Sequence, residues 1–222
     1  MTETMPMFPL NTVLFPGVSV PLHVFEDRYR ALVHKLLTVD DPAERLFGSF
    51  AIREGYEVGD HGGQSLHRIG CYLQLTEVEA HEDGTFDIVA VGRGRVRLDA
   101  VDTSNAYLSG EVVRLTETDD GVHPEVAERT LALFTRYREE LSELRGSEVL
   151  AGDLPHDPAY LAWSLAATCL LTMRQRQALL EAETVELRLA MIAEMLHDEL
   201  SAMRAVPSLP ATEVARTRWS PN

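Results

Sequence analysis

The chain has 222 residues, of which 45% are hydrophobic and 25% are charged, the ordinary range for a folded globular protein. Its net charge of −15 gives the molecule a field that repels phosphate backbones and anionic lipid, which disfavours nucleic acid and membrane surfaces as partners. A chain of this length buries roughly 70% of its unfolded surface, enough for one large domain or two modest ones.

Prolines and a glycine interrupt short apolar runs in the first thirty residues. Phe15-Pro16-Gly17 predicts a turn, in which Pro16 sets the bend and Gly17 takes a positive φ. Strand alternation resumes at 18–20, and Pro21 is expected to end it because proline has no amide donor.

A short helix is predicted after this strand. Its apolar residues recur at three- and four-residue spacing, at Tyr29, Leu32, Val33 and Leu36. Glu26 and Asp27 precede them, where acids favour a helix N-terminus. The local order is therefore strand, turn, strand and helix.

Residues 46–115 show the alternating apolar and polar residues, separated by loops and turns, that are typical of strands. Five segments fit this pattern, at 46–52, 69–78, 85–91, 96–100 and 107–115. Glycines between 55 and 63 predict a loop, and Glu82-Asp83-Gly84 predicts a hairpin turn. Six or more short strands with one helix predict a small closed or partly closed β-barrel.

Near residue 119 the spacing of the apolar residues changes to that of helices. Helical stripes run over 126–144, 160–171, 172–181 and 184–203. Asp157-Pro158 is a helix start, and Thr172 with Gln175 fits a capping box. No period is sustained after 206. We therefore expect a barrel at 1–118, a helical bundle at 119–206 and a disordered tail at 207–222.

Neither the cysteines nor the apolar segments indicate secretion. Cys71 and Cys169 lie in apolar settings where buried, reduced thiols are common. No charged-then-apolar leader begins the chain, and the longest apolar stretch, 160–173, is too short to span a membrane. We expect a cytoplasmic protein.

The order of several motifs resembles one known family. Phe8-Pro9-Leu10, Phe15-Pro16-Gly17 and Val20-Pro21-Leu22 look like the opening of the Lon protease N-terminal, substrate-binding domain. Ile69-Gly70-Cys71-Tyr72-Leu73, an acidic hairpin and Val91-Gly92-Arg93-Gly94-Arg95 follow in the family's order, and Gln177-Ala178-Leu179-Leu180-Glu181 precedes a Leu-rich final helix. The resemblance covers most of residues 7–203.

The resemblance implies an α+β fold, in which a PUA-like small β-barrel with one short helix is followed by a C-terminal helical bundle. In the full protease this region helps to capture unfolded polypeptide. A P-loop needs Gly-Lys-Ser or Gly-Lys-Thr, and a Ser-Lys peptidase needs a catalytic lysine. The only lysine, Lys35, lies between His34 and Leu36.

We therefore expect a stand-alone, non-enzymatic module without cofactor or metal. Its partner would be unfolded or extended polypeptide, or another protein. An RNA-binding PUA-like protein is the alternative, and an unrecognised hydrolase is a third hypothesis. The hydrolase is supported only by Gly17-Val18-Ser19-Val20-Pro21, in which Pro21 replaces the second glycine of a nucleophile elbow.

Two sets of histidines are candidate metal ligands. The spacing of His61, His67 and Cys71 matches no zinc knuckle, and loop histidines explain it better. His81-Glu82-Asp83-Gly84 lacks the second histidine of a zincin helix, so a turn is the better interpretation.

Arginines and tryptophans offer two further candidates. Arg93, Arg95 and Arg97 share one strand parity and are able to form an RNA-contact stripe, although pairing with nearby acids is favoured. Trp163 is expected in the core. Trp219 falls in the predicted tail, where an exposed aromatic residue could serve as a docking handle.

Polypeptide contacts are expected at the rim of the barrel, where loops project from a rigid scaffold. Two places qualify by exposure and charge or aromatic character. One is the start of the first helix, with Glu26, Asp27 and Arg28, and the other is the Gly-rich loop with Tyr56 and His61. Helix-terminal acids and a loop-closing tyrosine are the competing interpretations.

Overall fold

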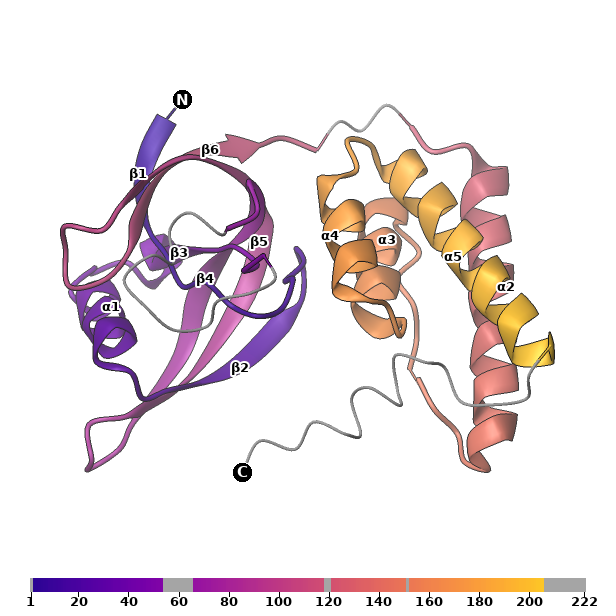
Figure 1. Ribbon diagram of the computed structural model, residues 1–222, viewed down its shortest axis with the longest axis horizontal. Coiled ribbons are helices and arrows are strands. Elements are labelled where there is room, and N and C mark those ends of the chain that lie inside the picture. Colours follow the sequence, from indigo (N-terminus) through magenta and orange to yellow (C-terminus); the bar gives the residue numbers. More distant parts are fainter. Residues whose placement is uncertain (1, 54–65, 118–120, 151, 206–222) are drawn as a thin grey trace. The chain divides into compact units, whose positions relative to one another are not determined.

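The computed structural model describes residues 2–53, 66–117, 121–150 and 152–205. The chain divides into two compact units, Met1–Thr116 and Glu117–Asn222 (Figure 1). Among the described residues, the first contains the strands and one α-helix, and the second contains four α-helices. Tyr56 and His61 of the predicted loop, and the predicted tail with Trp219, lie outside the described residues.

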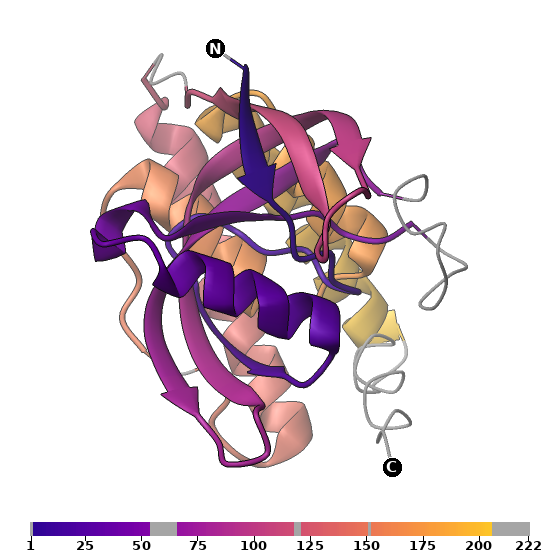
Figure 2. The same cartoon turned by 90° about the vertical axis from the view of Figure 1, so that its left-hand side faces the viewer.

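The first unit is built on a six-stranded antiparallel sheet. Its elements are β1 (Thr2–Pro6), β2 (Ser19–Val24), α1 (Asp27–Leu37), a 3-10 turn (Pro42–Glu44), β3 (Leu46–Ser49), β4 (Ile69–Ala80), β5 (Phe86–Asp102) and β6 (Ser109–Leu115). The strand order is β1-β6-β5-β4-β3, and β2 pairs with β5. Figure 2 shows the sheet curling around this unit, with α1 lying across it.

The sheet is not a closed barrel. Only isolated parallel bridges join the segment after β1 to β3 and the residues that follow it, Met7 with Gly48 and Leu10 with Ala51. Of the closed and partly closed barrels predicted, the closed one is therefore wrong. The α+β class is confirmed.

The core of this unit is formed by the inward residues of the sheet and one face of α1. Tyr29, Leu32, Val33 and Leu36, the four residues that predicted the helix, are all buried. They share a cluster with Phe47, Leu73, Ile88 and other sheet residues. Burial of this stripe fixes α1 against the sheet, since an isolated 11-residue helix is marginal in water.

The Phe15-Pro16-Gly17 turn is fastened to β5. Gly17 has φ 78°, as predicted. Its N–H donates to the Gly92 carbonyl at 2.9 Å, and the Gly92 N–H donates to the Val18 carbonyl at 3.0 Å. A Cβ atom at position 92 would collide with the Phe15 carbonyl oxygen. Glycine at 92 therefore lets the turn approach the strand.

Several strand boundaries differ from the prediction, and two of the differences bear on β2 and β5. Pro21 lies within β2, opposite Val89, instead of ending the strand. Among the described strands β2 pairs with β5 alone, and an edge strand tolerates the missing amide donor. The segments predicted at 85–91 and 96–100 form one strand, β5, whose register against β4 shifts between Tyr72 and Leu73.

The second unit has the four predicted helices: α2 (Pro124–Arg145), α3 (Pro158–Thr168), α4 (Met173–Glu181) and α5 (Val185–Ala205). Asp157 accepts the Tyr160 N–H at 3.0 Å at the start of α3. Thr172 and Gln175 form the predicted capping box. Gly146 ends α2 with φ 66°. Within the described residues, no helix combines the length and apolarity needed to cross a membrane.

The predicted packing residues of this unit are buried, together with one cation. Trp163 and Cys169 are buried here, as Cys71 is on β4 of the first unit, and burial raises the pKa of each cysteine to about 12. Arg188 on α5 is fully buried. Its guanidinium lies 3.5 Å from the Trp163 ring centroid. Sequence reasoning did not anticipate this buried charge.

Candidate functional site

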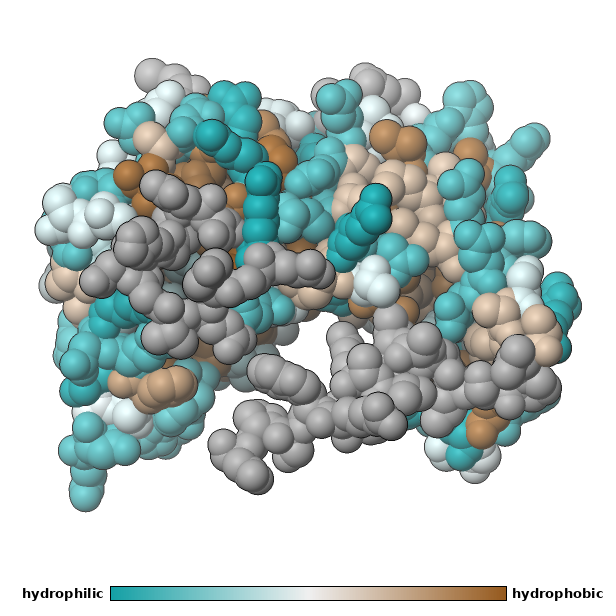
Figure 3. All heavy atoms as spheres, viewed as in Figure 1, coloured by the Kyte–Doolittle hydropathy of each residue, from teal (hydrophilic) through white to brown (hydrophobic). Residues whose placement is uncertain are grey.

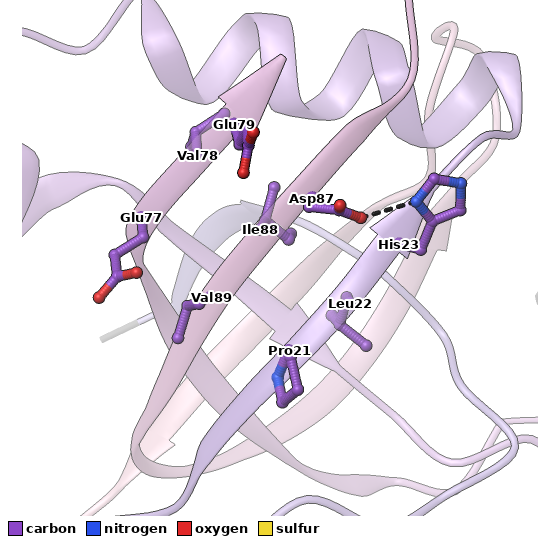
Figure 4. Close-up of a pocket in the computed structure, with 9 residues that line it drawn as sticks. All are labelled: Pro21, Leu22, His23, Glu77, Val78, Glu79, Asp87, Ile88 and Val89. Atoms are coloured by element: carbon purple, nitrogen blue, oxygen red, sulfur yellow. Dashed lines mark hydrogen bonds and ion pairs between the residues drawn. The ribbon is translucent and has the colours of Figure 1, made fainter. Parts of the chain in front are cut away.

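A groove lies on the outer face of the sheet where β2, β5 and β4 run side by side (Figure 4). We call it the β2 groove; it has a volume of about 490 Å³ and is lined by Pro21, Leu22, His23, Glu77, Val78, Glu79, Asp87, Ile88 and Val89. Register places His23 opposite Asp87 and Asp87 opposite Glu79. Alternation turns these three polar residues outward, while Leu22, Val78 and Ile88 pack toward the core.

Two imidazoles meet the Asp87 carboxylate at one end of the groove. His23 Nδ1 lies 2.7 Å from Asp87 Oδ1, and His81 Nε2 lies 2.9 Å from Asp87 Oδ2. Figure 4 shows the His23 ring and Asp87 facing each other from neighbouring strands. His81 comes from the hairpin that joins β4 to β5, at the turn predicted from Glu82-Asp83-Gly84.

Hydrogen bonds within the cluster shift the pKa values of Asp87 and His81. Hydrogen bonds from His23 and His81 hold the pKa of Asp87 below its ordinary value. The hydrogen bond to Asp87 raises the pKa of His81, and the nearby carboxylates of Glu79 and Asp83 add to that rise. This end of the groove therefore keeps a charged carboxylate between two imidazole rings. None of the described lining residues is Ser, Thr, Cys or Lys.

Phe25 lies beside this cluster, directly after β2. Its side chain is 63% exposed, the highest value among the large apolar side chains that the structure describes. Its ring stacks with that of His23 at a centroid distance of 6.1 Å. In the view of Figure 3 hydrophilic residues cover much of the described surface. An aromatic side chain this exposed is a candidate contact for a partner.

The structure brings together three of the predicted binding residues at the start of α1. Arg28 Nη2 lies 2.7 Å from Glu26 Oε2, and the Arg28 guanidinium lies over the Tyr29 ring at 4.6 Å. Asp27 pairs with Arg30 at 3.0 Å while its own side chain is 97% exposed. Glu26 occupies the N-cap position but makes no side-chain capping bond.

Two of the remaining motif candidates lack the geometry of a site, and His61 of the His61, His67 and Cys71 set lies outside the described residues. Ser19 begins strand β2 and not a strand-to-helix turn, so it has no elbow geometry. Arg93 and Arg97 are exposed, but Arg95 is only 4% exposed. Arg97 pairs with Asp99 at 2.9 Å. The three arginines therefore do not form one continuous exposed stripe, because the register shift at this point breaks the alternation.

The comparisons with known proteins bear on the whole chain. The model of the ATP-dependent protease La (LON) substrate-binding domain family matches residues 4–198. The chain belongs to this family. Two bacterial relatives are the Lon protease of Desulfosudis oleivorans, 22% identical over 209 residues, and the Lon protease 2 of Herpetosiphon aurantiacus, 27% identical over 213 residues. Each alignment covers 91% of this chain, but 25% and 24% of the respective relative. The chain thus spans about a quarter of their length.

Solved structures show the same fold. A Lon N-terminal domain protein from Xanthomonas campestris has a TM-score of 0.61 at 23% identity, covering 94% of this chain and 99% of that one. The N-terminal domain of the Mycobacterium avium complex Lon protease has a TM-score of 0.60 at 21% identity, covering 88% and 99%. The resemblance drawn from the opening motifs is confirmed. The matched family is that of the substrate-binding domain alone.

Proposed function

We propose that the sheet unit of this chain binds extended or unfolded polypeptide as a non-enzymatic interaction module. Membership of a substrate-binding domain family supports the class of ligand. The observation that carries the proposal on this chain is the exposed Phe25, which stands between edge strand β2 and the charged start of α1. We name the segment 23–28 the β2–α1 strip.

The β2–α1 strip has the parts that recognition of an extended chain needs. Because β2 pairs with β5 alone among the described strands, its other side is suited to an added strand of polypeptide. Phe25 supplies an apolar anchor, and burial of such a ring contributes about 1.5–3 kcal/mol. Glu26 and Asp27 offer carboxylates to basic side chains of the ligand, and Arg28 offers a cation to acidic ones.

The Gly-rich loop is the second part of the proposed surface. Tyr56 and His61, which the sequence predicts as contacts, stay candidates there. Their contribution is separable from that of the β2–α1 strip by substitution, since Tyr56→Ala leaves residues 23–28 unchanged.

The test is binding of a fluorescein-labelled, permanently unfolded protein, such as reduced and carboxymethylated lactalbumin, measured by fluorescence anisotropy. We expect Phe25→Ala to weaken binding about tenfold, the equivalent of burying most of one ring. Combined replacement of Glu26, Asp27 and Arg28 by Ala should weaken binding further and reduce its salt dependence. Tyr56→Ala measures the contribution of the Gly-rich loop to binding.

The matched control is Tyr160→Ala. Tyr160 on α3 is an aromatic residue with 62% exposure, almost the same as Phe25, so its loss tests whether any exposed ring attracts the ligand. It should bind as wild type does. A wild-type chain that captures no unfolded protein contradicts the proposal. Equal affinities for wild type, Phe25→Ala and the triple variant contradict the placement on the β2–α1 strip.

A further inference from the structure

We propose that His23, His81 and Asp87 form a binding site for a divalent transition-metal ion of the zinc type. These three side chains are the group among the described residues whose ligand atoms, one from each, all lie within 4.8 Å of one another. The inference does not rest on polypeptide binding, because it concerns a different class of ligand, although His23 is also the first residue of the β2–α1 strip.

The donor set matches the chemistry of zinc. Two imidazole nitrogens and one carboxylate oxygen suit Zn²⁺, Ni²⁺ or Cu²⁺, whereas Mg²⁺ and Ca²⁺ prefer oxygen ligands throughout. In a tetrahedral zinc site with bonds of about 2.1 Å, donor atoms lie roughly 3.4 Å apart. The separations of up to 4.8 Å therefore require the donor atoms to approach one another by up to about 1.4 Å, a change within the reach of side-chain rotation.

Proton movements balance in a simple way. In the metal-free protein His23 and His81 each share a hydrogen bond with Asp87. A ring that donates this hydrogen bond while neutral shifts its proton to the other ring nitrogen when the metal binds, so no proton is released. A ring that starts as an imidazolium releases one proton to solvent. The metal then takes the place of the hydrogen between each ring and the carboxylate.

Rigid backbone elements position the three ligands. His23 and Asp87 are cross-strand partners in the β2–β5 ladder. The hairpin fixes His81, whose N–H donates to the Thr85 carbonyl at 2.9 Å while its carbonyl accepts the Gly84 N–H at 2.9 Å. Gly84 has φ 81°, and the Asp83 carboxylate accepts the Thr85 N–H at 2.9 Å. Ligands held in this way lose little freedom on binding a metal.

The surroundings of the three ligands attract a cation, and the site is open to solvent. The side chains of His23, Asp87 and His81 are 55%, 54% and 35% exposed. Glu79 is the cross-strand partner of Asp87 on β4 and lines the same groove. Its charge and that of Asp83 attract a divalent cation. Three protein ligands leave a fourth position for water or for a group of a bound partner.

The competing explanation is that these groups only form a hydrogen-bond network that ties β2 to the hairpin. Because His23 and Asp87 are exposed and His81 is only half-buried, such a network contributes little to stability. A metal site predicts that the protein binds zinc, whereas a hydrogen-bond network alone predicts that it does not. A zinc titration therefore decides between the two explanations.

The experiment uses the full chain without an affinity tag, treated with EDTA and dialysed. Titration with ZnCl₂ by calorimetry should give one site per chain, with MgCl₂ giving no heat of binding at the same concentrations. His23→Gln and His81→Gln should each weaken zinc binding at least tenfold. His34→Gln is the matched control, because His34 is an exposed histidine of the same unit on α1, and it should bind zinc as wild type does.

A second measurement locates the metal. In spectra that detect histidine ring nitrogens, zinc should shift Nδ1 of His23 and Nε2 of His81 and leave His34 unchanged. The proposal is overturned if wild type binds no zinc, if both His23→Gln and His81→Gln keep wild-type affinity, or if the ring signals of His23 and His81 do not respond. Melting temperatures of the apo variants show whether each of them is folded.

Discussion

Replacing Arg188 with alanine should destabilise the helical unit more than any exposed substitution. The Arg188 guanidinium donates to the Leu179 carbonyl at 3.1 Å and to the Ala182 carbonyl at 3.0 Å, and it pairs with Glu117 at 3.3 Å. It also stacks on Trp163. One side chain therefore joins α5 to the C-terminal end of α4, to Glu117 and to Trp163 on α3.

The magnitude follows from what the change leaves behind. Arg188 is fully buried while the Glu117 side chain is 30% exposed, so the cost approaches the value of about 3–5 kcal/mol for removing one partner of a buried ion pair. Two carbonyls would lose their donors, at about 1–3 kcal/mol for each buried group left unsatisfied. These contributions overlap because alanine leaves room for water, so we expect a total of about 3–5 kcal/mol. Arg188→Lys should lose about 2 kcal/mol, since an ammonium group cannot stack as a plane and reach both carbonyls.

Tryptophan fluorescence isolates this effect. Trp163 and Trp219 are the two tryptophans of the chain, so in a Trp219→Phe background the emission reports on the surroundings of Trp163. Urea unfolding followed in this way gives the free energy of unfolding of the helical unit. Arg136→Ala is the control, because Arg136 is 56% exposed in its pair with Glu140, and it should change stability by less than about 1 kcal/mol. A change for Arg188→Ala as small as that of the control would refute the reasoning.

Three further predictions concern the turn, pH and the tail. Gly17→Val should destabilise the sheet unit by about 1–3 kcal/mol, because φ 78° is unfavourable for a β-branched residue; an unchanged melting temperature would remove this account of the turn. The hydrogen bond between His123 and Glu186 raises the pKa of His123 above 6.5 and lowers that of Glu186 below 4.5, so it stabilises the unit most between those pH values. Its contribution is lost as pH rises through the raised His123 pKa or falls through the lowered Glu186 pKa. The melting-temperature difference between wild type and His123→Gln should therefore be largest near pH 5.5, and a difference independent of pH would contradict the assignment. Ending the chain at Val206 should leave the melting temperature unchanged, whereas a large loss would mean that the predicted tail docks on the folded part.

Local patterns predicted the elements well where the signal lies within a few residues. Helical spacing and capping residues placed α3, α4 and α5, because a cap such as Thr172 with Gln175 acts within one turn. The Pro-Gly pair predicted the turn at Gly17. β1 was missed, because its residues Thr-Glu-Thr-Met-Pro bury only Met5 and show no alternating apolar pattern.

Long-range pairing was beyond sequence reasoning. His23 and Asp87 are 64 residues apart and meet through the β2–β5 register, so no spacing rule predicts their contact. Arg95 is buried because a register shift changes which residues of β5 face outward. Arg188 could have been noticed, because it follows Val185 by three residues and precedes Ile192 by four, which places it on the apolar stripe of α5.

The most direct test of polypeptide binding at the β2–α1 strip is to map the contact on the protein itself. Backbone amide spectra of the 15N-labelled chain would be recorded with increasing amounts of unlabelled unfolded protein. The account predicts that amide shifts concentrate at residues 22–30 and saturate with the ligand. Shifts confined to α2–α5, or no shifts at concentrations where anisotropy reports binding, would contradict it.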